Sequence, residues 1–160
     1  MDAISILALS IEHPLLRAVD LFFDSAIVYI AIILTLIVIS EKRNDKRRKI
    51  VLSLVVAFLI ATTVKVMLAH ERPCIGQLEC PNDYSFPSLH ATIAFTLMCG
   101  FLNKKSFSFF MFFALLIAFT RLNLGVHVFQ DIAGALPVAL ISYYITDVFW
   151  KKIKRDKRGT

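Results

Sequence analysis

Long apolar runs separated by short charged segments make up most of this 160-residue chain. Five of the runs have, or come close to having, the length and composition of membrane helices. They cover residues 21–40, 50–69, 88–102, 106–124 and 128–150. This pattern predicts an all-α protein, a polytopic membrane helix bundle with five transmembrane helices, in a single domain over residues 1–160.

Composition points the same way. Hydrophobic residues make up 58% of the chain and charged residues only 19%, and the mean hydropathy is +0.70. A water-soluble domain of this size has too few buried positions to use so many apolar side chains. The composition therefore excludes a soluble domain and indicates an integral membrane protein.

Residues 1–20 are interrupted too often by polar residues to form a sixth span. Polar residues recur here at steps of three and four, which is typical of a helix lying on the membrane surface; they are Ser10, His13, Arg17, Asp20 and Asp24. We expect an N-terminal interfacial helix on the outer side, with Pro14 suited to a helix start. No basic segment or cleavage signal frames the first apolar stretch, so we expect it to remain in the mature protein.

Basic residues gather beside the apolar runs, and 14 of the 18 lie in three clusters, at residues 41–49, 104–105 and 151–158. Clusters that flank membrane helices mark the cytoplasmic side. This accounts for the net charge of +6 without nucleic acid, which we exclude as a partner. With five spans, the N-terminus lies outside, the loop at residues 70–87 is extracytoplasmic, and the basic tail at residues 151–160 is cytoplasmic.

The cysteines add one open question. Cys74 and Cys80 lie in the extracytoplasmic loop, where a disulfide and two free thiols are both compatible with the sequence. Cys99 belongs to the membrane core.

Three of the four remaining basic residues lie near the outer ends of the predicted spans: Lys65, Arg72 and Arg121. Lys65 and Arg72 are two helical turns apart, so a continuous helix would project both from one face. One such residue alone is explained by snorkelling to headgroups or by pairing with a nearby acid, namely Glu71, Glu79 or Asp83. Three cations at one depth indicate an anion site instead.

Two histidines share that depth. His90 lies at the mouth of the third span, and His127 precedes Asp131 by four residues, which places both on one helical face. The carboxylate can then accept the ring N–H and fix the tautomer. An isolated pair of this kind often only packs two helices, and a metal site is a second alternative, but no cysteine is in register with it.

Phosphate is the anion that fits this set best. Guanidinium groups bind its oxygens bidentately, an ammonium group adds a compact charge, and phosphoryl transfer is catalysed mainly by such positioning and charge neutralisation. A carboxylate is the weaker alternative.

Three stretches resemble the signature motifs of the type 2 phosphatidic acid phosphatase superfamily, which also includes vanadium haloperoxidases. They are Lys65-VMLAHE-Arg72-Pro73, Pro87-Ser88-Leu89-His90 and Arg121-LNLGV-His127-VFQ-Asp131. The spacings KxxxxxxRP and RxxxxxHxxxD match in full, and the motifs follow in order over residues 65–131, on the side that the charge pattern places outside.

The resemblance implies a role for each residue. His127 would attack phosphorus to form a phosphohistidine, held and polarised by Asp131, and His90 would protonate the leaving oxygen and then activate water. Phosphate oxygens would be held by Lys65, Arg72, Ser88, Arg121 and the backbone amides near Leu89. No metal and no cofactor is expected, because the cations would take the place that magnesium has elsewhere.

Two positions depart from the family pattern. Thr120 stands where the family usually has Ser, which keeps the hydroxyl. Leu89 stands where it usually has Gly, which narrows the pocket and removes backbone freedom. A serine-leucine-histidine form resembles the phosphosphingolipid synthase branch, so a lipid headgroup phosphotransferase stays open.

We therefore expect a membrane lipid phosphatase that acts on a polyprenyl diphosphate, of the undecaprenyl or dolichyl kind, and gives the monophosphate. The third span has 15 residues and covers about 22 Å, so His90 would be recessed in the bilayer, where a lipid phosphate reaches it more easily than a soluble one. The alternatives are a phosphatidylglycerophosphate or phosphatidic acid phosphatase, the phosphotransferase, and a non-enzymatic anion-binding membrane protein. The oligomeric state is left open.

Overall fold

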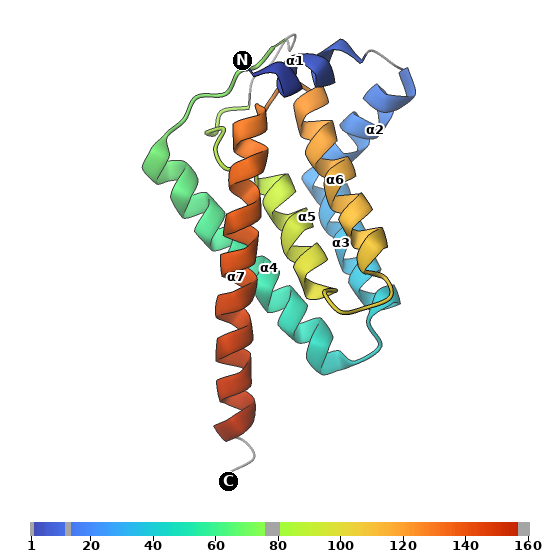
Figure 1. Cartoon of the computed structure of the whole chain (residues 1–160), viewed down its shortest axis with the longest axis vertical. Helices are drawn as coiled ribbons and strands as arrows, with labels where there is room; N and C mark the ends of the chain where they lie inside the picture. Colours follow the sequence, from blue (N-terminus) through green and yellow to red (C-terminus); the bar gives the residue numbers. More distant parts are fainter. Residues whose placement is uncertain (1, 12–13, 76–80, 157–160) are drawn as a thin grey trace.

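The computed structural model describes residues 2–11, 14–75 and 81–156, and these residues form seven α-helices and no strand (Figure 1). The helices are α1 (Ala3–Ser10), α2 (Pro14–Asp24), α3 (Ala26–Ser40), α4 (Asn44–Leu68), α5 (Leu89–Gly100), α6 (Phe107–Asn123) and α7 (Phe129–Asp156). The expected all-α class is confirmed. The last three predicted spans match α5, α6 and the start of α7 to within two residues.

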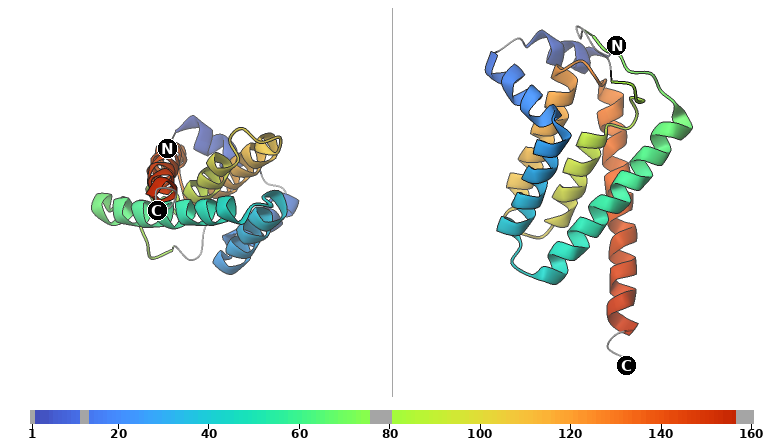
Figure 2. Two further views of the ribbon diagram at one scale, coloured as in Figure 1. Left: turned by 90° about the horizontal axis from the view of Figure 1, so that it is seen from below. Right: turned by 180° about the vertical axis from the view of Figure 1, so that it is seen from behind.

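Successive helices from α3 to α7 run in opposite directions along the long axis of the molecule (Figures 1 and 2). Helix α5 packs against α4, α6 and α7. Short α5 forms the centre of the bundle, because seven of its twelve residues are buried. Its two buried threonines, Thr92 and Thr96, donate to the carbonyl oxygens of Ser88 and Thr92 at 2.8 Å. Their hydroxyl groups are thus satisfied inside the helix itself.

Two helices, α4 and α7, are long and apolar enough to cross a bilayer. A third candidate is the bent pair formed by residues 17–24 of α2 and by α3, which meet at 86°. Helices α5 and α6 are apolar but shorter, with 12 and 17 residues. Large apolar side chains such as Ile27 and Met67 are more than three-quarters exposed, as expected for surfaces that face lipid.

The expectation of one interfacial helix over residues 1–20 is wrong. The region holds two helices, α1 and α2, and α2 continues to Asp24, four residues into the first predicted span. Pro14 does begin a helix, but the break before it separates Ser10 from Arg17 and Asp24, so the predicted polar stripe does not follow one helix. His13 lies outside the described residues.

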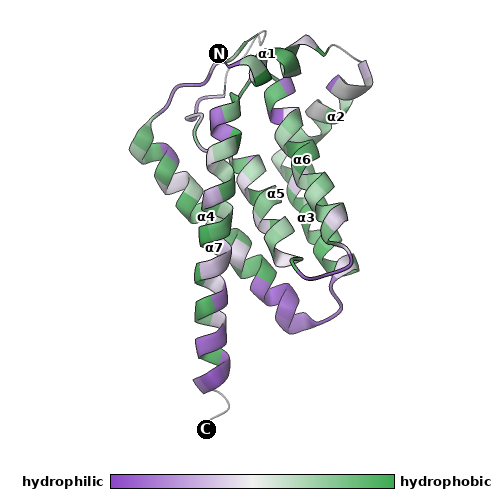
Figure 3. Ribbon diagram, viewed as in Figure 1, coloured by the Kyte–Doolittle hydropathy of each residue, from purple (hydrophilic) through white to green (hydrophobic). Residues whose placement is uncertain are grey.

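The three basic clusters lie at the same end of the bundle, as the hydrophilic colouring of Figure 3 shows. Ion pairs connect them: Lys104 lies 2.9 Å from Glu41, and Lys154 lies 2.7 Å from Asp45. The first cluster includes the first residues of α4, so this helix begins six residues before the predicted span. The third cluster extends α7 to Asp156.

Candidate active site

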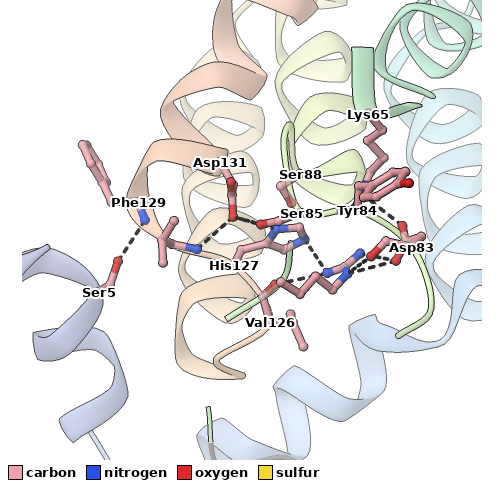
Figure 4. Close-up of polar contacts among 12 residues, drawn as sticks. Ser5, Lys65, Asp83, Tyr84, Ser85, Ser88, Val126, His127, Phe129 and Asp131 are labelled. Carbon is pink, nitrogen blue, oxygen red and sulfur yellow. Dashed lines mark hydrogen bonds and ion pairs between the residues drawn. The ribbon is translucent and has the colours of Figure 1, made fainter. Parts of the chain in front are cut away.

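The residues singled out in the sequence lie at the end of the bundle opposite the basic clusters, and Figure 4 labels Lys65, Ser88, His127 and Asp131 among them. They come from five neighbouring segments: the end of α4, the loop between α4 and α5, the start of α5, the end of α6, and the α6–α7 link with the first turn of α7. In that order they are Lys65, Arg72, Ser88, Leu89, His90, Arg121, His127 and Asp131.

His127 lies between two fixed partners. Its Nδ1 is 3.2 Å from Asp131 Oδ2, and its Nε2 is 3.1 Å from Arg72 Nη1. A guanidinium group can only donate hydrogen bonds, so Nε2 must be the acceptor and Nδ1 carries the proton. His127 thus presents a lone pair at Nε2, as a nucleophilic imidazole requires.

The protonation of His127 follows from its surroundings. Its side chain is buried, and this burial lowers its pKa to about 4, with a further contribution from the Arg72 charge, although the hydrogen bond to Asp131 acts in the opposite direction. The imidazole is therefore neutral near pH 7, and the lone pair on its Nε2 accepts the hydrogen bond from Arg72.

Asp131 is held more firmly than the sequence motif alone suggests. Its Oδ2 accepts hydrogen bonds from the backbone N–H of Val128, at 3.0 Å, and from Ser85 Oγ, as well as facing His127 (Figure 4). Its carbonyl oxygen accepts from the Ser88 N–H at 3.1 Å, which ties the α4–α5 loop to α7. Sequence reasoning missed Ser85, since it lies outside the three motifs.

Lys65 and Arg72 converge on one carboxylate. Asp83 Oδ2 lies 3.0 Å from Lys65 Nζ, while Asp83 Oδ1 accepts from Arg72 Nε at 2.9 Å and from Arg72 Nη2 at 2.6 Å. Partial burial raises the pKa of Asp83, but the hydrogen bonds from the two cations outweigh it and hold that pKa below its usual value. Asp83 is therefore an anion between two cations, which is the pairing that the sequence left as an alternative.

Arg121 is buried, with 2% of its side chain exposed, and its Nη1 lies 2.8 Å from Asp24 Oδ1. Its Nε and Nη2 have no hydrogen-bond partner among the described residues, and neither has the buried Ser88 Oγ. Buried donors without partners are costly. An anion that reached these groups would supply the missing acceptors.

His90 is positioned by α3. The Tyr29 hydroxyl donates to the His90 carbonyl oxygen at 2.8 Å, and the two ring centroids are 4.8 Å apart. His90 lies close enough to Arg121, Arg72 and His127 to interact with them electrostatically. Leu89 is the first residue of α5, and the N–H groups of a first helical turn have no partners within the helix, so they form a site suited to anions.

The two remaining sequence questions concern Thr120 and the cysteines. Thr120 is buried and donates to the Ile117 carbonyl oxygen at 2.8 Å, so its hydroxyl serves α6 itself. Cys74 is disulfide-bonded, Cys99 is a free and buried thiol, and Cys80 lies outside the described residues.

Together, the apolar helical bundle and its cluster of cations and histidines point to a class of membrane protein with a candidate anion site. The profile of the PAP2 superfamily matches residues 46–155. The chain belongs to this superfamily, and the resemblance carried by the three motifs is confirmed.

Two curated relatives are similar in sequence. The chain is 32% identical over 111 residues to YbjG of Escherichia coli (strain K12), whose provisional name is undecaprenyl-diphosphatase, covering 64% of this chain and 56% of YbjG. It is 27% identical over 113 residues to phosphatidylglycerophosphatase B of Bacillus subtilis (strain 168), covering 62% of this chain and 56% of that protein. The chain thus spans about half the length of both relatives.

Two solved structures share the fold. LpxE of Aquifex aeolicus superposes with a TM-score of 0.68 at 22% identity, covering 89% of this chain and 92% of LpxE. A PAP2-type phosphatidylglycerolphosphate phosphatase from Bacillus subtilis gives a TM-score of 0.67 at 22% identity, covering 96% of this chain and 85% of that one.

Proposed function

We propose that this protein hydrolyses the phosphate group of a membrane lipid through a phosphohistidine on His127. The observation that carries the proposal is the line of contacts from Arg72 through His127 to Asp131, which leaves a neutral imidazole with its lone pair on Nε2. Asp131 then stabilises the imidazolium that forms when Nε2 bonds to phosphorus.

In the first step, Nε2 of His127 forms a bond to phosphorus, and the bond from phosphorus to the leaving oxygen breaks. His90 gives its proton to that oxygen. In the second step, His90 takes a proton from water, the water oxygen bonds to phosphorus, and the nitrogen–phosphorus bond breaks. The products are the dephosphorylated lipid and inorganic phosphate, and the imidazole is restored.

The cations supply the charge stabilisation. Arg121 and Ser88 have buried donors that await partners, and Lys65, Arg72 and the first turn of α5 complete a ring of positive charge around the transferred group. We propose that this ring makes a divalent metal unnecessary.

For the substrate we propose a polyprenyl diphosphate, with phosphatidylglycerophosphate or phosphatidic acid as the alternatives. A shallow, open apolar surface on α3 supports a lipid substrate. It is lined by Ile27, Val28, Ala31, Ile32, Thr35 and Leu36, on the face of the helix away from the buried Tyr29. The provisional name of YbjG supports a diphosphate.

For the topology we propose five spans, α3 to α7, with the site on the extracytoplasmic side. The alternating direction of these helices and the position of all three basic clusters opposite the site support this arrangement (Figure 3). Basic clusters beside membrane helices stay on the cytoplasmic side. With five spans, this places the N-terminus outside and the C-terminus inside.

The test is phosphate release by the purified protein in detergent, with a panel of lipid mono- and diphosphates and a chelator present. We expect turnover that is insensitive to the chelator and is lost by at least about 10³-fold in His127→Ala, since the nucleophile is removed. His70→Ala is the matched control, because His70 is an exposed histidine in the α4–α5 loop. Strict dependence on a divalent metal, or equal loss in both variants, would contradict the mechanism.

The phosphotransferase is the second candidate, and Leu89 is the observation that favours it. Adding an acceptor lipid to the same assay separates the two functions. A hydrolase keeps releasing inorganic phosphate, whereas a transferase makes a headgroup-exchanged lipid and little free phosphate. A protein that binds phosphate but turns over none of the substrates would be a non-enzymatic anion-binding protein.

A further inference from the structure

We propose that Asp83 is a resident competitor of the substrate phosphate, a carboxylate that occupies the Lys65–Arg72 half of the site until a phosphate group displaces it. This inference rests on the proposed function. Asp83 belongs to none of the three motifs, and its carboxylate lies where two phosphate oxygens would be bound, bridging an ammonium and a guanidinium group.

The donors of Arg72 show why the carboxylate and a phosphate compete. Nε and Nη2 both donate to Asp83, while Nη1 donates to the Val126 carbonyl oxygen at 3.1 Å and to His127. Four of the five N–H groups of a guanidinium are then in use. A bidentate contact with phosphate needs two adjacent donors, so Asp83 must release Arg72 first.

Lys65 is in the same position. Its ammonium group donates to Asp83 and to the Tyr84 carbonyl oxygen, and its side chain is only 6% exposed. Because a buried ammonium group needs a counter-ion, the carboxylate serves this purpose when no substrate is bound, and a phosphate oxygen takes its place when one is.

Displacement is easy for Asp83 and difficult for the cations. The Asp83 side chain is 54% exposed, whereas those of Lys65 and Arg72 are 6% and 9% exposed. Asp83 belongs to a loop whose neighbours Asn82 and Tyr84 are also exposed. The carboxylate can therefore turn into solvent, while the buried cations stay in place.

The competition has a consequence for inhibition by the product. The apparent affinity of a ligand that binds only when the site is open is reduced by the open fraction, and the factor is the same for every such ligand. A lipid phosphate has a chain that adds binding energy, whereas inorganic phosphate has none. Asp83 thus lowers inhibition by the phosphate product, while a lipid substrate keeps the binding energy of its chain.

The experiment measures binding of inorganic phosphate to the purified full-length protein by titration calorimetry and by its effect on the unfolding temperature. In Asp83→Asn we expect about tenfold tighter binding than in the unchanged chain, as follows if the site is open about one tenth of the time, and a larger stabilisation by phosphate. Asp83→Ala is measured alongside, in case the amide disturbs the loop.

Glu71→Gln is the matched control. It removes one negative charge from the same exposed loop, but Glu71 has no ion pair with Lys65 or Arg72 in the described part of the chain. We expect its phosphate affinity to stay within about twofold of the unchanged chain, because a solvent-exposed charge without a close partner is largely screened.

Unchanged or weaker phosphate binding in Asp83→Asn and Asp83→Ala would overturn the proposal, because it would mean that the carboxylate only orients the two cations. An equal gain in Glu71→Gln would also overturn it, since the effect would then be one of loop charge. Binding is read without turnover. The competitor role can thus fail while lipid phosphate hydrolysis is observed, and it can hold while hydrolysis is absent.

Discussion

At the scale of single residues, the neutral state of His127 links catalysis to stability. Its folded-state pKa of about 4 is below the ordinary histidine value of 6.5, so between these values the unfolded chain binds more protons than the folded one. The free energy of unfolding must then rise with pH across this window and lose the His127 contribution as the pH falls from about 6.5 to 4.

The prediction is a smaller pH dependence of stability in His127→Gln, which replaces the titrating ring with a neutral amide. Unfolding temperatures of both proteins in detergent, measured from pH 4 to pH 7.5, should converge at the acidic end as the unchanged chain loses more stability. The other three histidines are present in both proteins, so their contributions cancel in the comparison. If the unfolding temperatures of the two proteins changed in parallel over this pH range, burial would not be lowering the pKa of His127 in the folded state.

The sequence identified the residues with a motif but not the partners that hold them. The four-residue step from His127 to Asp131 is local, and the structure has the two side chains 3.2 Å apart. Ser85 and Asp24 contact Asp131 and Arg121 from 46 and 97 positions away. Serine and aspartate have many uses on exposed loops and helix ends, so no local pattern marks these contacts.

At the scale of elements, α1 supports the start of α7. Ser5 is 1% exposed, and its hydroxyl accepts from the backbone N–H of Phe129 at 2.9 Å and donates to Asp2 at 2.7 Å (Figure 4). Phe129 opens α7 two residues after His127. The N-terminal helix therefore helps to fix the link that carries the proposed nucleophile.

We predict that Ser5→Ala lowers the free energy of unfolding by about 1–3 kcal/mol, since a buried N–H loses its acceptor, and that it lowers kcat because the link becomes less fixed. Ser10→Ala is the control within the same helix. Its hydroxyl is exposed and donates only to the Leu7 carbonyl oxygen among the described residues. The two variants are compared by denaturant unfolding and by steady-state kinetics. Indistinguishable results for Ser5→Ala and Ser10→Ala would contradict this role of α1.

Apolar length was a good guide to the later helices and a poor guide to the first ones. Helices α5 and α6 begin and end within two residues of their predicted runs, because a charged or polar segment bounds each of them. The boundary between α2 and α3 falls at Ser25, inside the run that was predicted as one span. Asp24 and Ser25 interrupt the apolar residues there for only two positions, and so short an interruption did not predict the 86° bend.

At the scale of the whole molecule, the sequence-derived charge pattern and the three-dimensional arrangement agree on two opposite ends. The basic clusters were separated by more than 40 residues along the chain, and ion pairs now join them at the end away from His127. The pattern predicted this because each pass through a bilayer reverses direction. It could not show how deeply the site lies, since depth depends on how the helices pack.

The orientation gives a direct prediction. A cysteine introduced as Asn82→Cys should react with a membrane-impermeant maleimide on intact cells, whereas Asn44→Cys should react only after permeabilisation. Both asparagines are exposed. The unchanged chain gives the background, which we expect to be low since Cys74 is disulfide-bonded and Cys99 is buried. The reverse pattern of labelling would contradict an extracytoplasmic site.

The shortness of α5 has a consequence for inhibitor chemistry. Twelve residues rise only about 18 Å, against a hydrocarbon layer of about 30 Å, and Figure 1 shows α5 beginning deeper in the bundle than the neighbouring end of α6. Its first turn, which contains His90, is therefore recessed below the outer end of the bundle. A phosphonate inhibitor would need a narrow charged headgroup on an apolar chain that enters laterally from the outer leaflet, and compounds with a bulky headgroup would not reach this first turn.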